Sequence, residues 1–200
     1  MIVEQREGLG DRLRRETRHL HRAVEHRLLH EGWLEDLAAY RSLLGRLYGL
    51  HLHVESAVQR FAAQLDGVDL QGCAHGGLLR ADLAGLGAAA GREQFDRPPL
   101  LVADASEVLG ALYVLEGSTL GGQVICRLLS LRLGLSAAAG ASGLDPYGNR
   151  TVERWAAFVG GLNGWPGNPD RVIAGACSLF ACFDTWVLGA GLANNAVGEP

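Results

Sequence analysis

Apolar residues recur along this chain at intervals of three and four, the spacing of an amphipathic helix, and the β-branched and aromatic clusters that bound strands are missing. Over residues 9–30, apolar side chains share one side of a helical wheel while arginines fill most of the rest. Over residues 36–65, apolar positions advance by four and three in turn, which is typical of a helix packed along its whole length. The pattern predicts an all-α fold.

Helix-breaking residues divide the remainder of the chain. Four more helical patterns follow, at about 78–90, 104–133, 151–163 and 169–189. Gly91 and the pair Pro98 and Pro99 close the first of them. Asp104 or Ser106 is placed to cap the second, because a short side-chain oxygen at that position accepts a hydrogen bond from the first turn.

Length and composition indicate one globular domain. With 200 residues, of which 48% are hydrophobic, the chain buries enough apolar surface to offset the entropy lost on ordering. This length suits a single domain over residues 1–200, with residues 191–200 as a flexible tail. The short connections predict a compact bundle of about six helices.

Charge and hydropathy exclude several partner classes. Eighteen basic residues against twenty-two acidic ones give a net charge of −4, so no summed positive field favours nucleic acid. The longest uncharged runs, such as residues 172–183, fall short of the ~18 residues that cross a bilayer. The four cysteines form no CxxC pair, which predicts reduced thiols. We therefore expect a cytoplasmic protein with neither a nucleic-acid nor a membrane partner.

A polar ridge is predicted on the first helix. Arg14, Arg18, His21 and Glu25 lie within about 60° of one another at 100° per residue, beside the apolar stripe. A glutamate four residues after a histidine can accept the Nδ1–H of the ring, which leaves Nε2 free to bind a metal. Because this spacing is common on surface helices, an ordinary hydrogen-bonded pair is the alternative interpretation.

The same spacing occurs again on the second helix, where His51 and Glu55 form a rival candidate pair. His51 falls in the packing seam of that helix, so a partly buried structural histidine is the other interpretation. The remaining histidines of the first helix lie opposite its apolar stripe and are most simply a solvated face.

A second cluster lies in LYVLEGSTLGGQVI (112–125), where Gly117, Gly121 and Gly122 interrupt an otherwise apolar helix. Each glycine costs about 1 kcal/mol relative to alanine. The usual compensations are close backbone packing or a ligand lying on bare backbone. The spacing predicts that the three glycines share one face, and both compensations remain open at this point.

The segments LRRETRHLHRAVE (13–25) and LYVLEGSTLGGQVI resemble the proximal and distal helix motifs of the heme oxygenase family. Length, helical content and motif order agree with that family. The resemblance continues through most of the chain, including Trp155 with Phe158, although only the two quoted motifs are specific. EGSTLGG resembles the bacterial branch, whose members include enzymes that supply biliverdin to bacterial phytochromes.

The resemblance implies a bundle in which heme is sandwiched between a proximal helix and a kinked, glycine-rich distal helix. His21 would be the proximal ligand of the iron and Glu25 its hydrogen-bonding partner. Arginine suits a carboxylate, so Arg14 and Arg18 would face the heme propionates, with Tyr113 as a further partner.

On the distal side, the resemblance implies that Gly117, Gly121 and Gly122 bring backbone over the heme and leave room for bound dioxygen. Ser118 stands where mammalian members carry an aspartate that anchors distal water. The Ser118 hydroxyl can instead hydrogen-bond to a carbonyl one turn back in its own helix.

The activity implied is oxidative cleavage of heme, as both cofactor and substrate, to biliverdin with release of iron and carbon monoxide. Dioxygen and electrons from a ferredoxin or other reductase would be needed, since the chain carries no flavin or nicotinamide motif. A non-catalytic heme carrier or sensor of the same fold is the first alternative. The second is a non-heme di-iron oxidase using residues of both pairs and Glu116, although di-iron bundles favour Glu-x-x-His.

Overall fold

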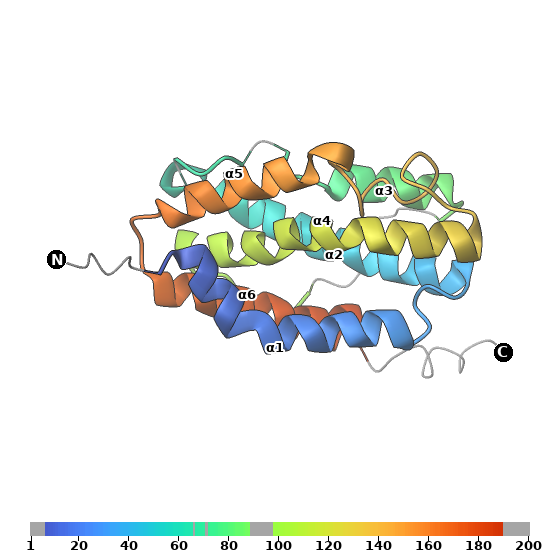
Figure 1. Cartoon of the computed structure of the whole chain (residues 1–200), viewed down its shortest axis with the longest axis horizontal. Helices are drawn as coiled ribbons and strands as arrows, with labels where there is room; N and C mark the ends of the chain where they lie inside the picture. The colour runs from blue at the N-terminus through green and yellow to red at the C-terminus, as the bar shows by residue number, and fades with distance from the viewer. Residues whose placement is uncertain (1–6, 66, 71, 89–97, 190–200) are drawn as a thin grey trace.

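The computed structural model describes residues 7–65, 67–70, 72–88 and 98–189 (Figure 1). Its α-helices are α1 (Leu9–His30), α2 (Leu37–Arg60), α3 (Gly76–Gly85), α4 (Ala105–Leu133), α5 (Thr151–Asn163) and α6 (Pro169–Cys182). Short helical turns lie at Ala62–Gln64 (η1), Gly148–Arg150 (η2) and Phe183–Val187 (η3). No strand occurs in these ranges, which confirms the all-α prediction. Gly91 and the expected tail at 191–200 lie outside the described residues.

Helix boundaries follow local capping chemistry. α4 begins after Asp104, whose side chain accepts a hydrogen bond from the Glu107 amide, so Asp104 rather than Ser106 is the cap. α4 ends at Leu133 and is capped by Gly134, whose φ of 68° lies in the left-handed region that favours glycine. α2 ends at Arg60, earlier than predicted, because the chain tightens into a 3₁₀ turn.

α3 is also displaced from its prediction, since it spans Gly76–Gly85 instead of 78–90. The last predicted helix divides in two, because α6 stops at Cys182 and continues as the π-helical turn Phe183–Val187. All four cysteines are free thiols, and Cys73 and Cys182 are buried.

α4 runs through the middle of the bundle and packs closely on α6 (Figure 1). A Cβ atom on Gly110 would overlap the carbonyl oxygen of Val172, and one on Gly175 would overlap the carbonyl oxygen of Glu107. The two helix backbones therefore touch at a pair of glycines that the sequence analysis did not single out. α2 and α5 cover other sides of α4, which holds the glycine-rich helix in a fixed frame.

α4 passes a length and hydropathy test for a membrane-spanning helix, the one helix among the described residues that does so. Its apolar window is 61% buried within the bundle, as in the core helix of a folded domain. The apolar length of α4 is therefore accounted for by protein packing.

α1 packs along α6 and, through its first turn, against α5, whereas its packing on α4 is slight. The Gly10 amide donates to Asn163 Oδ1 at 2.9 Å, and Leu13 is fully buried. Toward its other end, Arg27 donates to the carboxylate and carbonyl of Asp184 and to the carbonyl of Gly189. α1 is thus anchored at both ends and runs beside α4 rather than on it (Figure 1).

Candidate functional site

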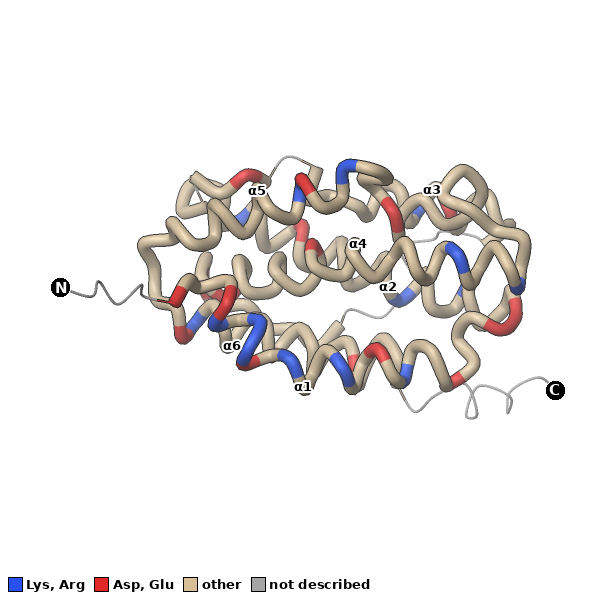
Figure 2. The backbone as a smooth tube through the Cα atoms, in the orientation of Figure 1, with Lys and Arg blue, Asp and Glu red and all other residues tan. Residues whose placement is uncertain are grey.

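The predicted ridge on α1 is exposed along its length. Arg14, Arg18, His21 and Glu25 all reach solvent, and Figure 2 shows the arginines of α1 along one edge of the molecule. The His21 ring lies edge-on to Phe180 of α6, with ring centroids 6.1 Å apart. No hydrogen bond joins His21 to Glu25 within the described parts of the chain. The ridge is therefore assembled as predicted, but the imidazole–carboxylate bond is not formed.

The part of α4 from residue 120 to residue 131 has an exposed apolar face. Leu120, Val124 and Leu131 are 39%, 52% and 84% exposed, and helical spacing places them on one side. On the same side, no non-neighbouring heavy atom lies within 4 Å of where a Cβ would stand on Gly121. Bare backbone and exposed apolar side chains thus lie together here, an arrangement that suits a flat apolar ligand.

The glycines of α4 do not share this face, so the prediction that all three lie on one face is wrong. Gly122 is buried, and a Cβ there would overlap the carbonyl oxygen of Leu144 in the loop after α4. A Cβ on Gly117 would lie 3.4 Å from the Trp155 indole, at ordinary contact distance. Of the two interpretations left open, close backbone packing describes Gly122 and a bare platform describes Gly121.

The hydroxyls that follow Gly117 bond within their own helix. Ser118 Oγ donates to the Leu115 carbonyl at 2.6 Å, and Thr119 Oγ1 donates to the Glu116 carbonyl at 2.7 Å. The bond from Ser118 is the backward bond weighed from the sequence. Ser118 is exposed, whereas Thr119 is buried, so only Ser118 also meets solvent.

Tyr113 is 9% exposed and lies deep beside α5, where its ring packs against Trp155 with centroids 5.3 Å apart. Burial raises the pKa of Tyr113, and the nearby charge of Arg14 partly offsets that effect. Tyr113 therefore interacts electrostatically with Arg14, a residue of the polar ridge on α1.

The rival pair on α2 separates into two structural roles. Glu55 Oε1 accepts the Gly76 amide at 2.8 Å, so this carboxylate satisfies a free amide at the start of α3. His51 is buried, its Nδ1 has no protein partner among the described residues, and burial lowers its pKa to about 3. The two side chains do not act together as a ligand pair.

A buried polar network lies on the other side of α4. The Tyr147 hydroxyl lies 2.8 Å from Glu116 Oε2 and 3.0 Å from both His75 Nε2 and the Gly72 carbonyl oxygen. The His75 ring in turn lies 5.7 Å from the His51 ring. The sequence analysis missed this network, because its members are far apart along the chain and only the fold brings them together.

Glu116 does not form a metal site together with the two histidine–glutamate pairs. Within the described ranges, no three His, Cys, Asp or Glu side chains converge as a metal site would require. The di-iron alternative therefore lacks a donor set.

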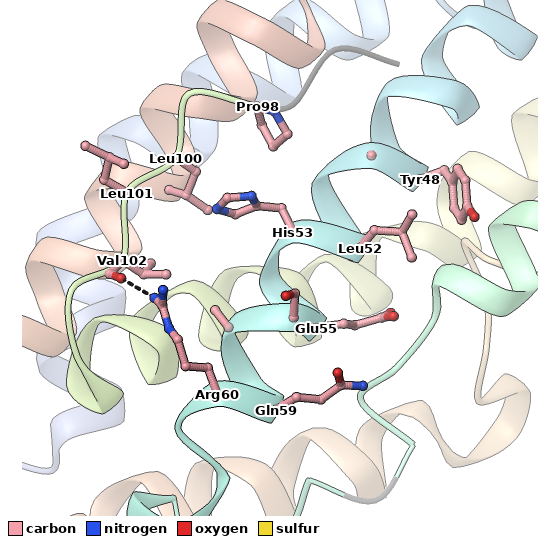
Figure 3. A pocket seen from close by; sticks show the side chains of 13 residues that line it. Tyr48, Leu52, His53, Glu55, Gln59, Arg60, Pro98, Leu100, Leu101 and Val102 are labelled. Carbon is pink, nitrogen blue, oxygen red and sulfur yellow. Dashed lines mark hydrogen bonds between the residues drawn. The ribbon is translucent and has the colours of Figure 1, made fainter. Parts of the chain in front are cut away.

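A separate hollow of about 730 Å³ lies between α2 and residues 98–102 (Figure 3). His53 and Arg60 of α2 point into it, and Arg60 donates to the Val102 carbonyl at 2.8 Å across its edge. None of the residues predicted on α1 or α4 lines this hollow.

The all-helical bundle is similar to solved heme oxygenases. The heme oxygenase of Neisseria meningitidis, solved with bound NO and CO, is similar with a TM-score of 0.79 and 22% identity over 90% of each chain. Heme oxygenase-1 of Synechocystis, solved with heme, gives 0.69 and 16% over 88% of this chain and 89% of that one. Heme oxygenase 2 of Chlamydomonas reinhardtii, solved without heme, gives 0.74 and 17% over 97% and 99%.

The heme oxygenase family model matches residues 7–188, so this chain belongs to the heme oxygenase family, whose members degrade heme. No curated protein sequence matches the chain significantly. The residues present on α1 and α4 are chemically suited to heme. Gly121 and Val124 offer an open apolar surface, while His21 and the arginines of α1 are accessible for an iron and for carboxylates.

Proposed function

We propose that this enzyme binds heme between the exposed ridge of α1 and the open face of α4, and cleaves it to biliverdin with release of iron and carbon monoxide. The observation that carries the proposal is the bare backbone at Gly121, which leaves the α4 surface free of side chains beside exposed Leu120 and Val124. Heme bound here would be both the cofactor that activates dioxygen and the substrate that is oxidised.

Each side of the site has its own proposed role. His21 would hold the iron through Nε2, and Glu25 would accept a hydrogen bond from Nδ1–H of the same ring. Arg14 and Arg18 pair with the propionates, and Tyr113 supports that end through its proximity to Arg14. Gly121 leaves room above the ring, whereas the Trp155 indole limits that space at Gly117. Ser118 is an exposed hydroxyl between them, available to accept a hydrogen bond from water.

The partners proposed follow from the chemistry. Dioxygen and an external electron donor, such as a ferredoxin or another reductase, complete the reaction, because the chain has no flavin or nicotinamide motif. The exposed arginines along α1, which Figure 2 shows in blue, suit an acidic donor. A bacterial phytochrome as acceptor of biliverdin rests on the resemblance of EGSTLGG to the bacterial branch. A cytoplasmic location rests on the shortness of the uncharged runs.

The optical spectrum of hemin-reconstituted protein tests the assignment of His21. We expect a histidine-ligated Soret band that His21→Ala shifts and that exogenous imidazole restores, because imidazole can occupy the space left by the side chain. Glu25→Ala should keep ligation but weaken it, since Glu25 would act on the ring and not on the iron. An unchanged spectrum in the His21→Ala variant would contradict the proposed ligand.

Turnover separates an enzyme from a carrier or sensor of the same fold. The hemin complex is incubated in air with ascorbate or with reduced ferredoxin. We expect the Soret band to decay and biliverdin absorption to appear. A Soret band that persists, with no biliverdin formed, would favour the carrier.

A further inference from the structure

The Trp155 indole covers one turn of the α4 face that is otherwise open. Its Cη2 and Cζ3 atoms lie 3.4 and 3.5 Å from where a Cβ would stand on Gly117. One turn further along, the corresponding space at Gly121 is empty. The bare platform of α4 therefore ends at Gly117 against the edge of an aromatic ring.

This indole is held firmly in place. Its ring packs on Tyr113 at a centroid distance of 5.3 Å and stacks near Phe158 at 6.0 Å, with planes 21° apart. Tyr113 and Phe158 are themselves buried. The neighbouring Arg154 donates to Asp69 Oδ2 at 2.8 Å, which fixes this turn of α5 against the segment before α3. Trp155 thus packs against two buried aromatic rings and forms a wall at this end of the open α4 surface.

The opposite end of the platform has no such wall within the described residues. Val124 and Leu131 lie further along α4 on the same side and are 52% and 84% exposed. A flat ligand lying on this surface meets a steric limit at Gly117 and continues freely in the other direction. The contact with the indole therefore decides where such a ligand comes to rest.

We propose that Trp155 is a positioning residue that sets the in-plane placement of the tetrapyrrole, and so selects which edge of the ring lies over Gly121 and which meso carbon is attacked. The inference rests on the proposed function for its ligand. Because His21 would hold the iron in place, removal of the indole leaves the macrocycle free to turn about the iron, so the ring gains a second in-plane orientation.

The test compares Trp155→Leu, which removes the wall, with Trp155→Phe, which keeps an aromatic edge. Trp165→Phe is the matched control, because that indole lies in the loop after α5 and donates to Ser106. The first readout needs no turnover: the heme-methyl proton resonances of the cyanide-bound ferric complex report the rotation of the ring in its pocket. For Trp155→Leu we expect a minor pattern whose proportion rises about tenfold, which corresponds to the loss of one aromatic contact.

The second readout is the ratio of biliverdin isomers, separated by chromatography after turnover. The isomer ratio should follow the methyl pattern in Trp155→Leu and stay unchanged in Trp155→Phe and Trp165→Phe. A Trp155→Leu protein that binds hemin with the wild-type methyl pattern would overturn the inference. Trp155→Met provides the same comparison if the leucine variant does not fold.

The two proposals fail in different ways. If wild-type protein binds hemin but forms no biliverdin, the proposed reaction is wrong, and the resonance pattern still decides the role of Trp155. If biliverdin forms and its isomers do not respond to Trp155→Leu, the reaction stands and the wall does not set the placement.

Discussion

Two glycines one residue apart, Gly121 and Gly122, meet opposite environments. A Cβ at Gly122 would overlap the Leu144 carbonyl, whereas a Cβ at Gly121 would meet open space. At the residue scale, the missing side chain therefore allows close packing at Gly122 and leaves the helix backbone accessible at Gly121. The same distinction applies to Ser118 and Thr119, whose hydroxyls make equivalent helix bonds but differ in exposure.

Alanine substitutions at the two glycines should therefore have opposite effects on stability. We expect Gly122→Ala to destabilise the heme-free protein by about 1–3 kcal/mol, because the Leu144 backbone must move. Gly121→Ala should stabilise it by about 1 kcal/mol, since alanine is the better helix former. Urea unfolding of both variants measures the difference, and equal effects would contradict the packing described here.

Gly121→Ala should also weaken hemin binding, because its methyl group would stand on the proposed platform. This opposition of stability and binding at one residue separates a functional glycine from a structural one.

At the scale of elements, α4 is held from both sides. Gly110 and Gly175 bring its backbone onto α6, while Glu116 connects it through Tyr147 to His75 at the start of α3. Both imidazoles are buried and so are kept neutral: burial lowers the pKa of His75 to about 4 and that of His51 to about 3.

These lowered pKa values make the fold sensitive to acid. In the unfolded chain both imidazoles take up a proton near pH 6.5, but in the folded state only near pH 3–4. The unfolded state therefore binds more protons in this window, so stability is complete above about pH 6.5 and falls as the pH is lowered toward 4. Unfolding free energies measured across this range test the sign.

His51→Leu is the informative variant for this effect, because His51 is buried and its Nδ1 has no protein partner among the described residues. We expect a shallower loss of stability between pH 6.5 and 4 than in wild-type protein. An exposed histidine such as His19 provides the control, and His19→Leu should leave the slope unchanged. A steeper slope in His51→Leu would contradict the assignment of a neutral buried imidazole.

At the scale of the whole molecule, α1 carries His21, the proposed ligand of the heme iron, but packs mainly on α6 and α5. Its far end depends on Arg27, which bonds to Glu31, Asp184 and Gly189 and so connects α1 to the π-helical turn after α6. The proposed site therefore lies between two helices, α1 and α4, that make little direct contact with each other. Binding of heme would add contacts in between and should raise the stability of the complex.

Arg27→Ala should loosen this connection. We expect a loss of about 1–2 kcal/mol in heme-free protein, because a half-buried guanidinium loses charged and carbonyl partners together. Amide hydrogen exchange should increase at residues 183–189 first. Arg15→Ala, which removes an exposed arginine paired with Glu7 and Glu16, should cause no measurable change. Equal effects of the two variants would contradict the anchoring role.

The helices, the ridge on α1 and the glycine-rich segment of α4 follow from sequence alone, because the periodicity of apolar residues and the caps act within a few residues of one another. Those two segments also carried the family resemblance, which the match over residues 7–188 bears out. Three features appear only in the folded chain: Gly122 packs while Gly121 stays bare, Glu55 bonds to the first turn of α3, and Glu116 meets His75 and Tyr147. Such contacts depend on how distant elements come together, and no spacing along a single helix encodes the neighbour that its faces will meet.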